Sequence, residues 1–355
     1  MEHKDTYQAL ANHLDAFPQG FPATESGKEL DLLAALFAPD EAQFALHLSL
    51  SYQPVDELSI LAGLSRTDSL VLIKGMVSKG LVNMRRSNLG IEVSLLPFIV
   101  GFYERQVFRM DKTFAQLFED YIQEARKGLL TVEPQFHRVI PINASIKSTV
   151  EILPEEDVTT LLSNKGAWAV FDCTCRKQQT LLDQACEHPL KVCLAMSDQP
   201  GAFDNAPNME ALDLESALKV LDYAAQSGLV HTVSNQKDEI SYICNCCTCG
   251  CGLLRGIADA HMANVVARSS YFAVVDEHLC IGCQECEPMC QFDAITINTI
   301  AMIDRNVCTG CGVCARVCPE GAISLLQRPL EEMKPIPEDK DAWLTQRREA
   351  RGLKV

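Results

Sequence analysis

The chain has 355 residues, 47% of them hydrophobic, so its length suggests about two or three domains that can each bury a core. No stretch approaches the roughly 20 apolar residues that a membrane helix needs, which argues against membrane insertion. The formal net charge of −16 makes nucleic acid an unlikely partner and favours partners with a basic patch.

The seventeen cysteines point to metal ligation. The first ten residues, MEHKDTYQAL, lack a basic segment followed by an apolar one, so we expect a cytoplasmic protein. Because the cytosol keeps thiols reduced, cysteines there bind metals more often than they form disulfides.

Residues 1–28 are expected to be an N-terminal lead-in, and residues 29–130 a helical domain. Between residues 54 and 96 the signals follow the order helix, turn, helix, hairpin, with Ser65 capping the second helix and Gly80 ending it. This order resembles a winged helix-turn-helix domain.

The resemblance allows a DNA-binding interpretation, in which a recognition helix and a wing carry the contacts. The residues for that role are Arg66, Thr67, Ser69, Lys74, Arg85 and Arg86. Since basic residues are few and the chain is acidic, we favour a scaffold or protein-docking module.

Residues 98–128 are predicted to form one long amphipathic helix that bridges the first and second domains. Its apolar positions alternate in steps of four and three: Tyr103, Val107, Met110, Phe114, Leu117 and Tyr121.

Residues 131–270 are predicted to form a small, cysteine-rich α/β domain. Strands are expected near residues 139–142, 150–152 and 168–171, and a hairpin over residues 229–243. His231, on that hairpin, is either a ligand or proton donor of a nearby site or a satisfied strand residue.

Nine cysteines of this domain fall in two clumps, each introduced by a strand: Cys173, Cys175, Cys186, Cys193, Cys244, Cys246, Cys247, Cys249 and Cys251. Adjacent residues such as Cys246 and Cys247 point apart on most backbones, so ligands drawn from both clumps are more plausible than one run alone. The alternatives are one additional 4Fe-4S cluster with spare thiols, two additional clusters, or a zinc site.

Eight further cysteines form two runs of identical spacing, C-x2-C-x2-C-x3-C: Cys280, Cys283, Cys286, Cys290, then Cys308, Cys311, Cys314, Cys318. The flanks repeat as well, so that Asp276 matches Asp304 and Gly282 matches Gly310, which indicates an internal duplication. One position departs from the pattern, because Gln291 stands where the second run has Pro319. Zinc ribbons, the alternative, prefer C-x2-C pairs separated by a longer loop.

Residues 271–327 resemble a two-cluster bacterial ferredoxin, which carries two 4Fe-4S clusters. The resemblance implies a crossed pairing, in which the last cysteine of each run binds the cluster of the other run. Cys280, Cys283, Cys286 and Cys318 would hold one cluster, and Cys308, Cys311, Cys314 and Cys290 the other.

The sequence thus predicts an α+β multidomain protein with a winged-helix-like α domain, an α/β middle domain, a C-terminal ferredoxin-like domain and a charged tail over residues 328–355. The whole chain resembles a group of anaerobe proteins known only as iron–sulfur binding. The favoured function is an electron-transfer protein or subunit, more a component of an oxidoreductase system than a self-contained enzyme, whose redox partner carries a flavin or another iron–sulfur centre. The alternatives are a redox-sensing regulator and an oxidoreductase with a catalytic middle cluster.

Overall fold

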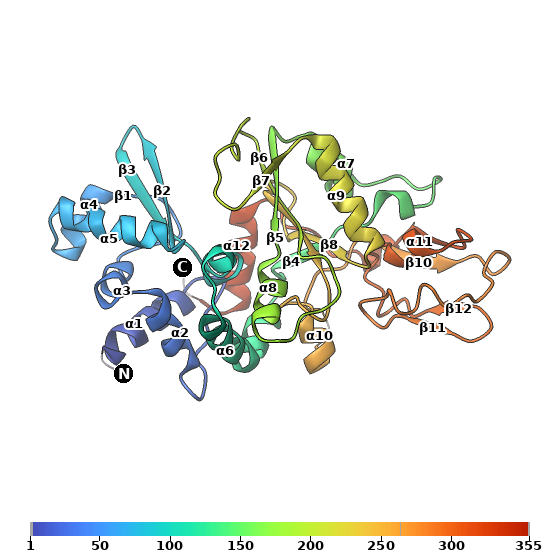
Figure 1. The fold of residues 1–355 in the computed structure, drawn as a ribbon, viewed down its shortest axis with the longest axis horizontal. Helices are drawn as coiled ribbons and strands as arrows, with labels where there is room; N and C mark the ends of the chain where they lie inside the picture. The colour runs from blue at the N-terminus through green and yellow to red at the C-terminus, as the bar shows by residue number, and fades with distance from the viewer. Residues whose placement is uncertain (1–2, 263, 354–355) are drawn as a thin grey trace. The chain divides into compact units, whose positions relative to one another are not determined.

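The structure is a computed structural model that describes residues 3–262 and 264–353 (Figure 1). Its contacts divide the chain into two compact units. Unit 1 comprises the described residues up to Glu133, the short segment Leu181–Asp183 and the C-terminal segment from Leu344. Unit 2 comprises Pro134–Thr180 and Gln184–Trp343, so the segments expected as separate middle and ferredoxin-like domains lie in one unit.

Unit 1 is mainly helical, with one small antiparallel sheet in the order β1-β3-β2. Its elements are α1 (Lys4–Asp15), α2 (Lys28–Leu36), α3 (Pro39–Ala45), β1 (Gln53–Pro54), α4 (Val55–Ala62), α5 (Arg66–Ser78), β2 (Val82–Ser87), β3 (Gly90–Leu95) and α6 (Lys112–Leu130).

The expected order of helix, turn, helix and hairpin is present over α4, α5, β2 and β3. Gly63 ends α4 with a φ of 67°, and the Ser65 side chain caps α5 by accepting a hydrogen bond from the Asp68 N–H. The hairpin pairs Val82 with Leu95 through Ser87 with Gly90. The N-terminal lead-in, by contrast, contains the helix α1, whose apolar face is buried.

The single long helix predicted for residues 98–128 is wrong. The backbone is not helical at Ile99, Val100 and Gly101, and a short 3-10 helix follows over Glu104–Phe108. Within this segment, the regular α-helix is α6. It begins after Asp111, whose side chain caps its start by accepting a hydrogen bond from the Phe114 N–H at 2.8 Å. The apolar residues before it pack as a loop, with the Phe98 and Phe118 rings stacked 5.1 Å apart.

The C-terminal segment, expected as a charged tail over residues 328–355, is partly buried. It forms α12 (Lys340–Ala350), in which Arg347 is fully buried. Its guanidinium donates hydrogen bonds to the carbonyl oxygens of Pro18, Leu129 and Val132 at 3.0, 2.9 and 2.7 Å. A buried guanidinium needs such acceptors, so the part of α12 from Leu344 onward, which carries Arg347, packs in the core of unit 1.

Unit 2 is built on a six-stranded antiparallel sheet in the order β4-β8-β9-β6-β5-β7. Its elements are β4 (His137–Val139), α7 (Val158–Ser163), β5 (Ala167–Asp172), α8 (Thr174–Leu181), β6 (Lys191–Ser197), β7 (Glu210–Leu212), α9 (Leu214–Gln226), β8 (Val230–Ser234), β9 (Tyr242–Cys246) and α10 (Arg255–Ala260). Residues 150–152, expected as a strand, are not in one, and Cys193 lies in β6 rather than in a loop.

The two faces of this sheet differ in chemistry. Leu194 and Ile243 pair across β6 and β9 and belong to the apolar core that α7 and α9 cover. Because side chains alternate along a strand, the neighbouring Cys193, Cys244 and Cys246 lie on the opposite face. One face of the sheet thus packs on a hydrophobic core, and the other face carries the cysteines.

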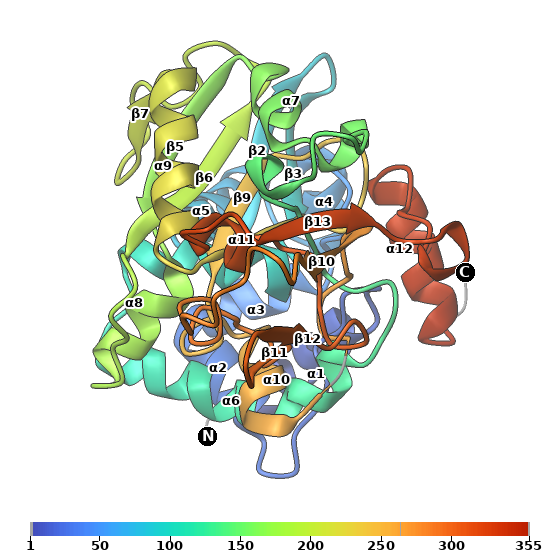
Figure 2. The ribbon, with the colours of Figure 1, turned by 90° about the vertical axis from the view of Figure 1, so that its right-hand side faces the viewer.

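The duplicated segment, residues 271–327, folds into two small antiparallel ribbons (Figure 2). One pairs β10 (Tyr271–Val275) with β13 (Ile323–Gln327), and the other pairs β11 (Ile295–Ile297) with β12 (Ala301–Ile303). The first strand of one repeat therefore pairs with the last strand of the other, and α11 (Val313–Val317) lies within the second repeat. No helix among the described residues is long and apolar enough to cross a membrane.

Candidate metal centres

The eight cysteines of the duplicated segment line two cavities. One cavity is lined by Cys280, Cys283, Cys286 and Cys318. The other is lined by Cys290, Cys308, Cys311 and Cys314. Each cavity thus collects three cysteines from one run and the last cysteine of the other, which is the grouping expected from the sequence.

Backbone N–H groups donate to the cysteine sulfurs in a pattern that follows the duplication. Ala294 and Ala322 donate to Cys290 and Cys318, four residues earlier, at 3.4 and 3.3 Å. In the equivalent pair, Ala273 donates to Cys308 at 3.5 Å and Ala301 to Cys280 at 3.4 Å. Such donors stabilise thiolates and help to set the reduction potential of an iron–sulfur cluster.

Two glycines allow the chain to fold closely around the cavities. Gly310 has a φ of +75°, and a Cβ there would lie 2.1 Å from the Tyr271 carbonyl oxygen. Gly282 has a φ of +65°, and its Cβ would lie 2.4 Å from the Thr299 carbonyl oxygen. A side chain at either position would therefore push the ligand loop away from its ribbon.

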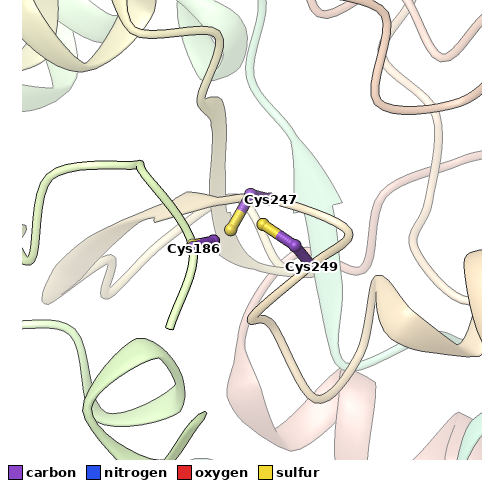
Figure 3. Close-up of side chains that lie close together, drawn as sticks. All are labelled: Cys186, Cys247 and Cys249. Atoms are coloured by element: carbon purple, nitrogen blue, oxygen red, sulfur yellow. The ribbon is translucent and has the colours of Figure 1, made fainter. Parts of the chain in front are cut away.

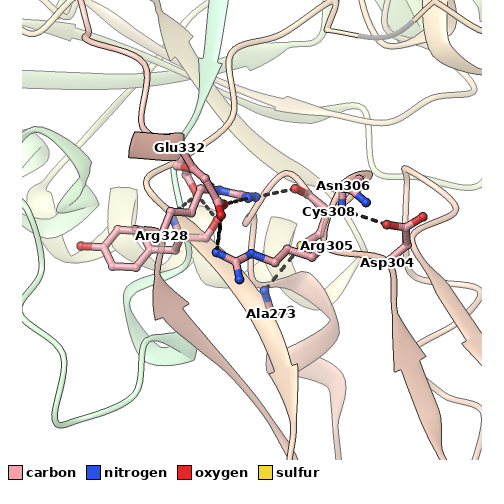
Figure 4. Close-up of polar contacts among 9 residues, drawn as sticks. Ala273, Asp304, Arg305, Asn306, Cys308, Arg328 and Glu332 are labelled. Carbon is pink, nitrogen blue, oxygen red and sulfur yellow. Dashed lines mark hydrogen bonds and ion pairs between the residues drawn. The ribbon is translucent and has the colours of Figure 1, made fainter. Parts of the chain in front are cut away.

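Two arginines fix the loop that carries Cys308 (Figure 4). Arg328 donates to the Cys308 carbonyl oxygen at 2.6 Å. Arg305 forms an ion pair with Glu332 at 2.8 Å, and its guanidinium lies 4.1 Å from the centre of the Phe272 ring. These contacts hold the ligand loop against β10 and the segment after β13.

The donor set fits iron–sulfur clusters. Burial raises the pKa of Cys286 to about 11 and that of Cys311 to about 12. Buried thiols of this kind stay protonated unless a cation replaces their protons, and iron does so when a cluster binds. Four cysteines around each cavity are the ligands that a 4Fe-4S cluster requires.

Six of the nine middle cysteines form a closed ring of thiols, which we call the six-thiol ring. Each thiol lies close enough to the next to influence its pKa, in the order Cys173, Cys175, Cys251, Cys246, Cys244, Cys193 and back to Cys173. Cys193, Cys244 and Cys246 come from β6 and β9. Cys173 lies between β5 and α8, Cys175 in α8 and Cys251 in the loop after β9. Both clumps of cysteines therefore contribute equally.

The Arg176 guanidinium lies beside this ring and is buried. It donates to the Asn245 carbonyl oxygen at 2.8 Å and lies 3.7 Å from the Cys247 sulfur. Its Nε and second terminal nitrogen have no hydrogen-bond partner among the described residues. The charge of Arg176 also contributes to a low pKa at Cys173, after hydrogen bonds from Cys175 and Cys193. A buried guanidinium with unpartnered N–H groups fits an anionic metal–thiolate centre nearby, because such a centre supplies a compensating negative charge and sulfur acceptors for hydrogen bonds.

The other three cysteines, Cys186, Cys247 and Cys249, meet in a second place, which we call the three-cysteine site (Figure 3). Their sulfurs all lie within 4.8 Å of one another. Cys247 is buried, Cys186 is partly buried and Cys249 is exposed. Cys186 comes from the segment between α8 and β6, and the other two from the loop after β9.

His231 is not part of either set. It pairs with Asn245 across β8 and β9, so it points to the face opposite Cys244 and Cys246. Its Nδ1 hydrogen-bonds the Asn245 Oδ1 at 2.5 Å, and burial lowers its pKa to about 4. The interpretation of His231 as a satisfied strand residue is the one that agrees with the structure.

Gln291 connects the duplicated segment to the loop after β9, which carries Cys247, Cys249 and Cys251 and which we call the cysteine-rich loop. Its Oε1 accepts hydrogen bonds from the Thr248 N–H at 2.8 Å and the Thr248 hydroxyl at 2.9 Å. Its Nε2 donates to the Gly228 carbonyl oxygen at 3.1 Å. Gln291 follows Cys290, and Thr248 lies between Cys247 and Cys249, so this contact joins two cysteine sites.

The two cysteine-lined cavities within a duplicated fold define an iron–sulfur protein with a general role in electron transfer. Residues 273–325 match the family model of the 4Fe-4S dicluster domain. No curated protein and no solved structure matches the chain significantly.

Sequence reasoning missed the roles of Arg176 and Gln291. For Gln291 a signal existed, because it is the position at which the first run departs from the second. For Arg176 no local signal exists, since its partners come from β9 and the loop after it, about 70 residues further along the chain.

Proposed function

We propose that this protein is an electron-transfer component in which the duplicated segment exchanges single electrons with a redox partner and with a further iron–sulfur centre at the six-thiol ring. The observation that carries the proposal is the Gln291 contact, which joins the cavity containing Cys290 to the loop containing Cys251. Cys251, three residues after Thr248, belongs to the six-thiol ring, so the contact holds a loop that carries one of its thiols against the segment of Cys290. Electron tunnelling falls steeply with distance, so this arrangement favours exchange.

The ligand sets of the duplicated segment are proposed from the two cavities. Cys280, Cys283, Cys286 and Cys318 would hold one 4Fe-4S cluster, and Cys290, Cys308, Cys311 and Cys314 the other. Each cluster supplies one reversible electron at a potential that its hydrogen bonds and exposure tune.

The exposure of the two cavities suggests which of them exchanges electrons with the redox partner. The cavity that Cys283 lines lies near the surface, since Cys283 is exposed and its neighbours Leu279 and Ile281 are 49% and 67% exposed. Glu285 and Glu320 also line this cavity and are exposed. An apolar rim with acidic side chains suits a redox protein with a basic patch. The segment of Cys290, by contrast, contacts the loop after β9 through Gln291 and Thr248.

The test is an iron count with a reductive titration, both under anaerobic conditions. Reconstituted protein should bind about 12 or more irons, since each added cubane brings four, and should accept at least one electron beyond the two of the duplicated segment. Cys246→Ser should remove the additional iron and leave the spectra of the duplicated segment unchanged. The exposed Ser241→Ala, close to β9, is the matched control. About eight irons in the unaltered protein would contradict the proposal.

For unit 1 we propose a winged-helix-like module that docks protein rather than DNA. The basic side chains of the DNA interpretation are partly neutralised, because Arg66 pairs with Asp56 at 2.6 Å and Arg85 with Glu92 at 2.8 Å. Apolar side chains are exposed on α4, α5 and the hairpin turn, with Ile60, Val71 and Leu89 at 81%, 65% and 63%. Such a surface suits a protein partner better than phosphates.

A further inference from the structure

The end of β9 and the cysteine-rich loop after it contribute cysteines to two separate sites, the six-thiol ring and the three-cysteine site. Cys246, on the strand, faces the six-thiol ring together with Cys244. Cys247 turns to the other side, where it joins the apolar cluster of Val192, Ala224 and Leu229 next to α9. Adjacent cysteines at the end of β9 therefore lie in different surroundings.

The spacing of the sulfurs distinguishes the three-cysteine site from the cluster cavities. Among residues 3–262 and 264–353, it is the one group of His, Cys, Asp or Glu whose ligand atoms all lie within 4.8 Å of one another. A zinc–thiolate bond is about 2.3 Å long, so three sulfurs this close can all reach one ion. A cubane needs its ligands spread around four irons, and neither cysteine set of the duplicated segment is as compact.

The fourth ligand position at such an ion is free of protein donors in the part of the chain that the structure describes, since no other His, Cys, Asp or Glu joins the group. His188, two residues after Cys186, hydrogen-bonds the Ser227 backbone instead. Cys249 is exposed, so solvent reaches this side of the site. Zinc sites closed by four protein ligands are structural, whereas three protein ligands leave a position for water or substrate.

Charge supports a dication at this place. Three thiolates and a dication carry a net charge of −1. The Arg176 guanidinium, 3.7 Å from the Cys247 sulfur and buried, supplies the compensating positive charge.

We propose that Cys186, Cys247 and Cys249 bind a single thiophilic ion, zinc, whose fourth position holds water and accepts a small thiol. Three thiolate ligands select a soft ion, and a thiol is the ligand class that competes best with water there. In the exchange the thiol sulfur bonds to the ion, water leaves, and the thiol proton goes to solvent. The site therefore presents a thiolate next to the Thr248–Gln291 contact with the duplicated segment.

Zinc analysis of the anaerobically purified full-length protein tests this. One zinc per chain is expected, and the zinc X-ray absorption spectrum should show three sulfurs at about 2.3 Å and one lighter ligand. Adding 2-mercaptoethanol should raise the sulfur count to four. Cys249→Ser should lose the zinc and keep its iron, and Cys246→Ser, as the matched control, should lose iron and keep the zinc.

Three results would overturn the inference: no zinc in the unaltered protein, four sulfurs before any thiol is added, or loss of iron rather than zinc from Cys249→Ser. Because Cys249 is exposed, its variant is expected to fold, and the spectra of the duplicated segment verify this. The zinc and iron counts are independent, so an unaltered protein with about eight irons and one zinc would refute the electron-transfer proposal for the six-thiol ring and leave this inference standing.

Discussion

The side-chain oxygen of Gln291 lies 2.8 Å from the Thr248 backbone nitrogen and accepts its hydrogen bond. Through this pair, the residue after Cys290 contacts the residue between Cys247 and Cys249. Arg316 and Asp222 form a second contact of the duplicated segment with the middle of unit 2, an ion pair of 2.9 Å between α11 and α9. The cysteine sites of unit 2 are therefore held in one framework.

Gln291→Pro should separate the two sites without emptying the duplicated segment. Pro319 occupies the equivalent position in the second run, so the ligand loop tolerates proline, but three hydrogen bonds are lost. We expect full iron content in the duplicated segment and a loss of roughly 1–3 kcal/mol in the free energy of unfolding. Electron exchange between the duplicated segment and the proposed centre at the six-thiol ring should become slower. Chemical denaturation and rapid-freeze spectroscopy measure these effects. Pro319→Gln is the mirror control; an equal loss there would show that Gln291 has no special role.

Cys318→Ser should damage the cluster of the first run, because Cys318 lines the cavity with Cys280, Cys283 and Cys286. Cys290→Ser should damage the cluster of the second run for the same reason. Electron paramagnetic resonance of the two variants, compared with a variant of Cys283, identifies which signal is lost. The crossed assignment fails if each variant loses the signal of its own run.

Gly310→Ala should prevent cluster assembly in the duplicated segment. Its Cβ would meet the Tyr271 carbonyl oxygen at 2.1 Å, and a backbone contact of this kind cannot relax by moving a side chain. Gly321→Ala is the control, since Gly321 has a φ of +60° but nothing within 4 Å of the added Cβ. We expect loss of iron from the first variant and only about 1 kcal/mol of destabilisation in the second. Equal iron contents would contradict the steric argument.

Arg85→Ala with Arg86→Ala should leave the behaviour of the protein towards DNA unchanged, because we expect no specific duplex to bind. Selection from a random duplex pool by the holoprotein at low salt measures this. A selected sequence whose affinity falls steeply with salt and drops in the double variant would establish a regulator instead.

Glu104→Gln should stabilise the protein in a pH-dependent way. Burial raises the pKa of Glu104 to about 7, although its carboxylate accepts the Gly101 N–H at 2.7 Å. The folded protein thus holds a proton that the unfolded chain releases near the ordinary pKa, so stability falls as pH rises between the two values. The gain from the variant should be up to about 2 kcal/mol larger at about pH 8 than at about pH 5.5. Denaturation at both pH values tests it, and a gain independent of pH would contradict it.

The local order of unit 1 could be predicted only in part. Ser65, Gly63 and Gly80 mark helix ends through their own backbone preferences, so the sequence shows α4, α5 and the hairpin. The apolar spacing in steps of four and three led to a wrong prediction of a helix before Asp111, because the same spacing fits a loop packed on aromatic rings.

The spacing of the two runs and their resemblance to a two-cluster ferredoxin predict which four cysteines line each cavity, because each run holds three of the four within seven residues and the duplication repeats the arrangement. The division of the nine middle cysteines into a ring of six and a site of three depends on the tertiary fold. Those cysteines lie up to 78 residues apart, from Cys173 to Cys251, and meet only when β5, β6 and β9 pair. The face that each side chain takes then follows from strand register, which spacing along the chain does not reveal.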